Sequence, residues 1–335
     1  MKITIKQHYV PQFYLRNFGN RLFGFDKKDD KIFPTTSKNI AFESDFYGPD
    51  IKGKESLEKI FSEMEKKWSI AIAELIRKES FFELKDESKF QITTFMAFQL
   101  IRTKQFRQDI SGIANSLMDI LLENKGIKKG SVKLSQEGEI KHHLLRLKDY
   151  SAFAKILSLM RFCVAINKTH LPFWTSDNPI NLQNDIPEQP PFGNKGLACR
   201  GIEIHLPITP RLVLTAMDPT MYHIIPESFA ITENRLIHRE NYHQYLNSTR
   251  FMFSNTKKFN QREKMLSTTP EVRGPDFVRF SMVHGLGDKN SKQIIQRKLN
   301  KSKLHKPENS SVGIDTWIDL DYVESLFKKI DSNPN

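Results

Sequence analysis

The sequence predicts an α+β fold, in which a mostly helical first half packs on a small antiparallel sheet formed by the second half. Three observations support this prediction: apolar residues recur with a helical period between residues 55 and 166, short alternating stretches follow residue 168, and no internal repeat is present. We expect a single α+β domain over residues 1–285, a basic linker over 286–307 and a short acidic helix over 308–335.

The chain begins with strand-like segments and continues with helical ones. Alternating stretches at residues 21–25 and 31–33 flank a charged turn, a pattern typical of a β-hairpin. From Glu55 to Ile76 apolar residues recur every three to four positions, which predicts a helix of about six turns.

The next helical region has no proline between residues 90 and 121, and Asp86 can cap its start. The pattern fits either one long helix or two helices joined near Gly112. We expect an exposed basic loop at residues 124–138 and a third helix at about 150–166.

The second half alternates at residues 202–206 and 211–215, which predicts strands, and a long surface loop rich in proline, asparagine and glutamine precedes them. Residues 233–253 have a helical pattern. Residues 289–306 carry seven Lys or Arg and no acid, whereas 308–335 carry six acids and two lysines. The opposite charges predict that the acidic segment folds back on the basic one.

The net charge of +12 favours a polyanionic partner, and we expect nucleic acid. No apolar run approaches the roughly 18 residues that span a bilayer, so we expect no membrane partner and a cytoplasmic location. The two cysteines, Cys163 and Cys199, are too few for a disulfide scaffold or a thiolate zinc site, so we expect no disulfide partner. The oligomeric state is not indicated.

Several motifs together resemble a known family. The opening His8-Tyr-Val-Pro-Gln-Phe-Tyr-Leu-Arg-Asn-Phe18 has the form H-x-V-P-x-x-Y-L-x-x-F, and Gln99-Leu-Ile-Arg102, Thr175-Ser-Asp-Asn-Pro179 and Leu206-Pro-Ile-Thr-Pro210 follow it. These stretches resemble domain-of-unknown-function family 4238 over about residues 1–256. Lys104 stands where that family often has proline, and the resemblance implies no established reaction.

The motif residues include groups that can carry chemistry. His8 is a candidate general acid/base or metal ligand, and Asp177, at a strand end, is a candidate metal ligand or base. Arg102 can hold a phosphate bidentately. The structural alternatives are a buried histidine bonded to backbone, a turn aspartate, and an ion pair between Arg102 and an acid of the first helix. Candidate binding residues beside them are Gln12, Tyr14, Gln99, Ser176, Asn178 and Asn241.

Basic residues of two segments are candidates for nucleic-acid contacts through phosphates, because these segments lack aromatic residues for base stacking: Lys125, Lys128, Lys129, Lys292, Arg297, Lys298 and Lys301. Walker, Rossmann, nucleophile-elbow, zincin and EF-hand motifs are missing from the sequence, which disfavours those enzyme classes.

The leading hypothesis is a nucleic-acid-directed hydrolase, a metal-dependent nuclease of the toxin or phage-defence type. A divalent cation, Mg²⁺ or Mn²⁺, would be held by Asp177 and His8, with Arg102 on the phosphate. One alternative is a non-catalytic nucleic-acid-binding or regulatory module, in which His8, Arg102, Asp177 and Asn241 only fix the fold. A second alternative is an enzyme that acts on a small anionic ligand at Arg102.

Overall fold

The computed structural model describes residues 6–48, 57–123, 128, 130–186, 195–259, 265 and 267. The expected basic linker and acidic C-terminal helix lie outside the described residues. The α-helices are α1 (Gln12–Arg16), α2 (Leu57–Lys78), α3 (Asp86–Ile101), α4 (Lys104–Glu123), α5 (Gln136–Leu147), α6 (Tyr150–Ser158) and α7 (Asn234–Asn247), with a 3-10 turn at Ser37–Asn39.

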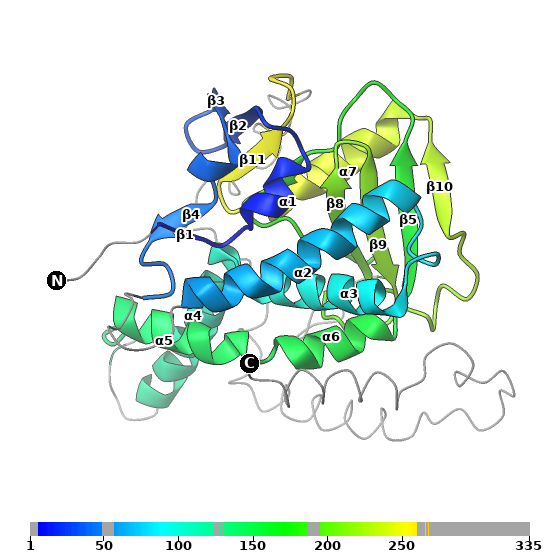
Figure 1. The fold of residues 1–335 in the computed structure, drawn as a ribbon. Helices are drawn as coiled ribbons and strands as arrows, with labels where there is room; N and C mark the ends of the chain where they lie inside the picture. Colours follow the sequence, from blue (N-terminus) through cyan, green and yellow to red (C-terminus); the bar gives the residue numbers. More distant parts are fainter. Residues whose placement is uncertain are drawn as a thin grey trace, which may run out of the picture.

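Within this part of the chain the strands are β1 (Lys6–His8), β2 (Leu22–Asp26), β3 (Lys31–Thr35), β4 (Phe42–Ser44), β5 (Arg161–Asn167), β6 (Thr175–Ser176), β7 (Asn181–Gln183), β8 (Glu203–Thr209), β9 (Leu212–Met217), β10 (Ser228–Ile231) and β11 (Phe251–Ser254). They form a five-stranded sheet of order β10-β5-β9-β8-β7, a four-stranded sheet of order β3-β2-β11-β6, and the pair β1-β4. The α+β class is therefore confirmed (Figure 1).

The five-stranded sheet is not wholly antiparallel, because β10 pairs in parallel with β5. β9, which precedes β10 in the sequence, pairs antiparallel with the opposite side of β5. The chain therefore crosses over β5 before β10 joins the sheet at its edge. A crossover of this kind leaves no local sequence signal, because each strand alone has the same alternating pattern.

The four-stranded sheet joins the two ends of the described chain. β2 and β3 form the expected hairpin, and β2 also pairs with β11, so that Phe25 lies opposite Met252. The Phe33 ring packs directly over Gly24, where a Cβ atom would lie 2.4 Å from its Cζ, so a larger residue at 24 would displace this ring.

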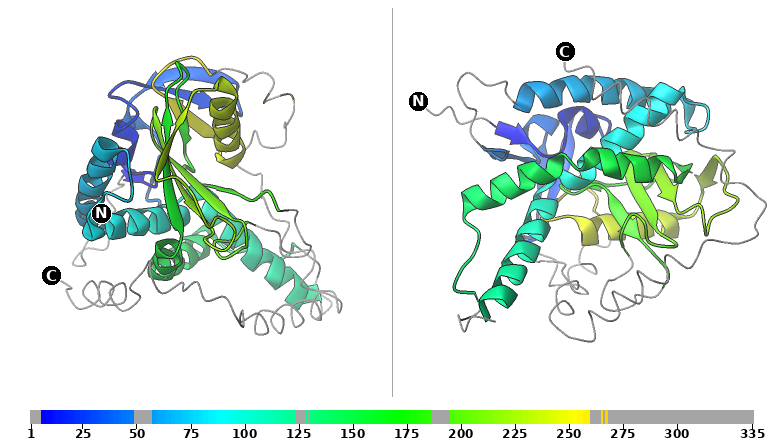
Figure 2. Two further views of the ribbon diagram at one scale, coloured as in Figure 1. Left: turned by 90° about the vertical axis from the view of Figure 1, so that its right-hand side faces the viewer. Right: turned by 90° about the horizontal axis from the view of Figure 1, so that it is seen from below.

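Helices cover both faces of the five-stranded sheet, as the left view of Figure 2 shows. Ile204 and Leu214 point to the main core, which α2, α3 and α6 complete. Val213 and Ile231 point to the other face, where Ile237 of α7 packs on them. This alternation fixes which residues of β7, β8 and β9 lie under α7.

The helices differ from expectation at three places. The helix expected over residues 233–253 ends at Asn247, and Phe251–Ser254 form β11, because this short apolar run pairs with β2 and β6. The long helical run breaks at Arg102 and Thr103 between α3 and α4, and α4 continues through Gly112. The expected helix at 150–166 ends at Ser158, and residues 161–167 form β5, because a short apolar run fits a buried strand as well as a helix. No helix of the described residues is long and apolar enough to cross a membrane.

Candidate functional site

The opening motif is anchored through Tyr14, which lies on the short helix α1 after Pro11. The Tyr14 side chain is fully buried, and its hydroxyl donates a hydrogen bond of 2.6 Å to the Pro207 carbonyl. The same hydroxyl lies 2.8 Å from Oγ1 of Thr175. One side chain therefore joins the opening motif, the T-S-D-N-P motif and the L-P-I-T-P motif.

Arg102 lies at the end of α3 and is only 2% exposed. Its Nη2 donates to the His8 carbonyl at 2.7 Å, its Nη1 pairs with Oε1 of Glu65 at 2.9 Å, and its Nε donates to the Tyr47 hydroxyl at 3.2 Å. Burial opposes the charge, but Tyr47 and Glu65 outweigh it and raise the pKa of Arg102. Gln99, one turn earlier, donates to the Tyr9 carbonyl at 3.1 Å.

His8, like Asn17 and Gln99 of the same motifs, has a buried side-chain atom without a hydrogen-bond partner among the described residues. The His8 side chain is 9% exposed, its ring lies 5.4 Å from that of Phe42, and its unpartnered atom is Nε2. Burial and the neighbouring Arg102 lower the pKa of His8 to about 4, so the ring is neutral at physiological pH. Gln12, at the start of α1, is half-buried.

The Asp177 site consists of the Asp177 carboxylate and the backbone that leads from α7 into β11. Oδ1 accepts from the Thr249 amide at 2.7 Å, and Oδ2 accepts from the amides of Arg250 and Phe251 at 2.8 Å each. Burial raises the pKa of Asp177, while the three amides and the buried Lys27 oppose that rise. The carboxylate therefore fixes the loop between α7 and β11.

The neighbours of Asp177 bind α7 itself. Ser176 donates to Gln244 at 2.9 Å, and Asn178 donates to the Asn247 carbonyl at 3.0 Å. Oδ1 of Asn241 accepts from the Trp174 amide at 2.8 Å, and its Nδ2 donates to a carbonyl at 3.0 Å. Ser176, Asn178 and Asn241 therefore hold α7 against β6 and the residues that flank it.

The structure brings the predicted site residues into two groups. His8, Gln99 and Arg102 meet at β1, whereas Asp177, its neighbours and Asn241 meet at α7; no hydrogen bond joins His8 to Asp177 in the described part of the chain. No three His, Cys, Asp or Glu side chains within the described ranges are placed to hold a metal ion. The catalytic and metal-binding roles stay predictions.

Among the predicted nucleic-acid contacts, Lys128 is described and exposed. The other six, Lys125, Lys129, Lys292, Arg297, Lys298 and Lys301, lie outside the described residues. The two cysteines, Cys163 and Cys199, are both free thiols.

A basic surface forms where two acid-free segments meet. Residues 1–25 and 241–259 contain no Asp or Glu. Pairing of β2 with β11 places them side by side, and a Cβ at Gly19 would lie 3.8 Å from Cβ of Asn255. Four exposed cations of these segments, Arg16, Arg21, Lys257 and Lys258, define this acid-free surface, whereas the exposed Lys6 lies on β1.

A buried ionic group that was not predicted from the sequence, here called the His205 cluster, consists of Glu203, His205 and Glu240. Nε2 of His205 lies 3.1 Å from Glu203, and Nδ1 lies 3.4 Å from Glu240 of α7. The Tyr222 hydroxyl donates to the other oxygen of Glu203. Burial alone would lower the pKa of His205, but Glu240 and Glu203 outweigh it and raise the pKa to about 9.

Two buried amides lie beside the His205 cluster. The register of β7 and β8 puts Asn181 opposite His205 and Gln183 opposite Glu203, on the same face of the sheet. Each is 5% exposed, and three of their side-chain atoms, Nδ2 of Asn181 and both Nε2 and Oε1 of Gln183, have no hydrogen-bond partner in the part of the chain that the structure describes. Polar residues alternating along both strands were the signal available in the sequence.

Comparison with known proteins identifies the family. The family model of a protein of unknown function, DUF4238, matches residues 6–258, so the chain belongs to this family. Comparisons with curated proteins and with solved structures give no match.

Proposed function

We propose that this member of the DUF4238 family is a nucleic-acid-binding module that contacts phosphates through the acid-free surface. The observation that supports the proposal is that two segments without acids, far apart in the sequence, lie side by side, and four of their exposed cations form the acid-free surface. Cations that gather on one surface favour polyanions and release counterions on binding.

The motif residues support binding rather than catalysis. The polar groups of Tyr14, Arg102 and Asp177 are occupied by the protein's own backbone or by other buried side chains. Groups that are already bonded and buried are poorly placed to meet a substrate. In this proposal the motifs keep the two acid-free segments in position.

A salt titration of binding tests the proposal. The fourfold variant Arg16→Gln, Arg21→Gln, Lys257→Gln, Lys258→Gln is compared with a control that removes the same charge elsewhere, Lys66→Gln, Lys67→Gln, Lys148→Gln, Lys168→Gln. Because each phosphate contact contributes about 0.9 to the slope of log K against log salt on duplex DNA, the first variant should reduce that slope by roughly 2–4. Equal losses in the two variants would contradict a localised surface.

A nucleic-acid hydrolase is the second candidate, and the buried, unpartnered Nε2 of His8 favours it. A neutral imidazole can accept a proton or bind a divalent cation. Cleavage of tRNA, single-stranded RNA and duplex DNA is measured with Mg²⁺, Mn²⁺ or EDTA. The His8→Gln variant should lose cutting, whereas His143→Gln, a change at another buried histidine of lowered pKa, should retain it. Binding without cutting by the wild-type protein would reject this candidate.

A further inference from the structure

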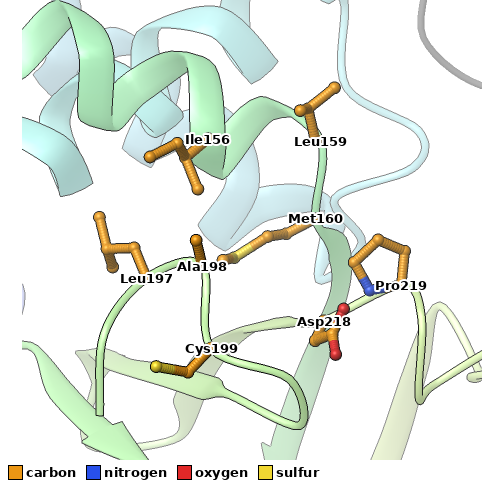
Figure 3. Close-up of a pocket in the computed structure, with 8 residues that line it drawn as sticks. All are labelled: Ile156, Leu159, Met160, Leu197, Ala198, Cys199, Asp218 and Pro219. Atoms are coloured by element: carbon orange, nitrogen blue, oxygen red, sulfur yellow. The ribbon is translucent and has the colours of Figure 1, made fainter. Parts of the chain in front are cut away.

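A small apolar groove lies between the end of α6 and the loop at residues 197–199 (Figure 3). Ile156, Leu159 and Met160 form one wall, and Leu197 and Cys199 form the other. The cavity measures about 120 Å³, well below the roughly 300–1,000 Å³ of sites for drug-sized ligands. Its size suits one inserted apolar side chain of a polypeptide.

The groove is apolar at its centre and basic around it. Leu159 lines the groove and is 43% exposed. The segments that form the two walls, residues 150–161 and 195–202, contain four cations and no acid. The Asp218 carboxylate at the rim is occupied, because it accepts from the Gly201 amide at 2.7 Å. A partner that fits must combine apolar residues with negative charge.

We propose that the acidic segment 308–335 of this same chain docks in the groove and inserts an apolar side chain. The segment carries six acids against two lysines, so its charge complements the basic walls. Trp317, Leu320, Val323 and Phe327 are spaced three or four positions apart, which predicts one apolar stripe along a helix.

The connection is long enough for this docking. Met265 still packs in the core, and the 46 residues between Ser267, the last described residue, and Ile314 would span about 37 Å as a random coil. A domain of the size of residues 1–259 has a radius of gyration of about 18 Å. The segment can therefore reach any face, and charge and apolar fit select the groove.

The groove contains its own reporter, the Cys199 thiol. Cys163 stays silent in thiol labelling, because it is 1% exposed and burial raises its pKa to about 11. The rate at which Ellman's reagent modifies Cys199 is measured in the full-length protein. Trp317→Ser with Leu320→Ser should raise this rate by about tenfold, because the docked segment covers the thiol in the wild type.

The matched control removes apolar residues from the opposite face of the same stretch, Ile318→Ser with Tyr322→Ser, and should leave the rate within about twofold of the wild type. Equal rates in all three proteins would overturn the proposal, and that outcome is expected if the acidic segment lies on residues 289–306 instead. A similar increase in both variants would also overturn it, since docking would then not use the stripe.

A second measurement reports on the acidic segment instead of the groove. Of the three tryptophans, Trp68 and Trp174 are 1% and 2% exposed, so acrylamide quenching of fluorescence reports mainly on Trp317. The groove variant Leu159→Glu should increase quenching, whereas Leu145→Glu, at an exposed leucine of α5, should not. If acrylamide quenched Trp317 as strongly in the wild type as in the Leu159→Glu variant, the proposal would be overturned independently of the thiol result.

Discussion

The Asp177 site and the His205 cluster both place ionisable side chains near α7, but the hydrogen-bond partners differ: backbone amides in the first and side-chain carboxylates in the second. Asp177 is bonded by three backbone amides, so its partners are fixed by the path of the chain. His205 is bonded by two carboxylates, and neighbouring amide atoms of Asn181 and Gln183 have no partner within the described residues.

The difference separates structural from adaptable polar groups. A buried group bonded to backbone costs much to remove and offers nothing to a ligand, because its hydrogen-bonding capacity is used. The bonds of a buried group whose partners are titratable side chains depend on pH. A neighbouring amide that has no hydrogen-bond partner can be replaced by an apolar side chain without loss of a hydrogen bond. Asp177, in the T-S-D-N-P stretch, belongs to the first kind, and His205 to the second.

The largest expected effect is at the Asp177 site. Asp177→Ala leaves three buried amides without an acceptor, so the free energy of unfolding should fall by about 3–5 kcal/mol. Urea denaturation measures the change. The control Asp185→Ala, at a carboxylate whose side chain is 82% exposed, should change stability by less than about 0.5 kcal/mol. A small effect at Asp177 would remove the distinction drawn between the two sites.

The next effect is the pH dependence that His205 contributes. Its folded pKa of about 9 lies above the unfolded value of about 6.5, so the stabilisation is complete below pH 6.5 and is lost as the pH rises to 9. The loss should be on the order of 2–3 kcal/mol. His205→Gln should flatten unfolding free energy between pH 6.5 and 9 relative to the wild type, whereas His170→Gln, at an exposed histidine, should not.

Smaller changes in the free energy of unfolding are expected at two buried amides, Gln244, which is hydrogen-bonded, and Gln183, which has no hydrogen-bond partner among the described residues. Gln244 is 2% exposed, accepts from Ser176 and donates to the Pro179 carbonyl at 2.7 Å. Gln244→Met should lower the free energy of unfolding by about 2 kcal/mol, whereas Gln183→Met should change it by less than about 1 kcal/mol or raise it. Thermal unfolding of both variants measures the difference. Equal losses would mean that Gln183 has partners in solution.

The smallest effect concerns Tyr14. Tyr14→Phe removes the hydroxyl that donates to Pro207 and leaves the ring packing in place. The expected loss is about 1–1.5 kcal/mol, measured by urea denaturation. The control Tyr242→Phe, at a half-buried tyrosine of α7, should cost less. A loss well above 2 kcal/mol at Tyr14 would show that joining the motifs is cooperative.

Periodicity predicted the elements that have one clear apolar pattern. The six-turn α2 and the β2–β3 hairpin are confirmed, and the α+β class with them. An ion pair between Arg102 and an acid of the first long helix was one alternative predicted from the sequence. The structure shows this ion pair, with Glu65 of α2 as the acid. Such contacts can be anticipated because a buried arginine needs a counter-charge.

The pairing of strands that are far apart in the chain could not be predicted from the sequence. Nothing in the pattern at 161–167 distinguishes a strand from the end of a helix, and β10 was not expected to join β5 in parallel. The His205 cluster needs α7 to lie over β8, and that placement depends on bonds from Asp177 and its neighbours. Residues that meet only through such packing leave no spacing to detect.

The pairing of Phe25 with Met252 has a consequence for the order of folding. The β2–β3 hairpin leaves the ribosome first, but its partner β11 follows 227 positions later, which takes about 10–45 s at 5–20 residues per second. During that time β2 has an open strand edge, the feature that promotes association between chains. Synthesis of this protein should therefore depend on chaperones, and slower translation should increase aggregation of the nascent chain.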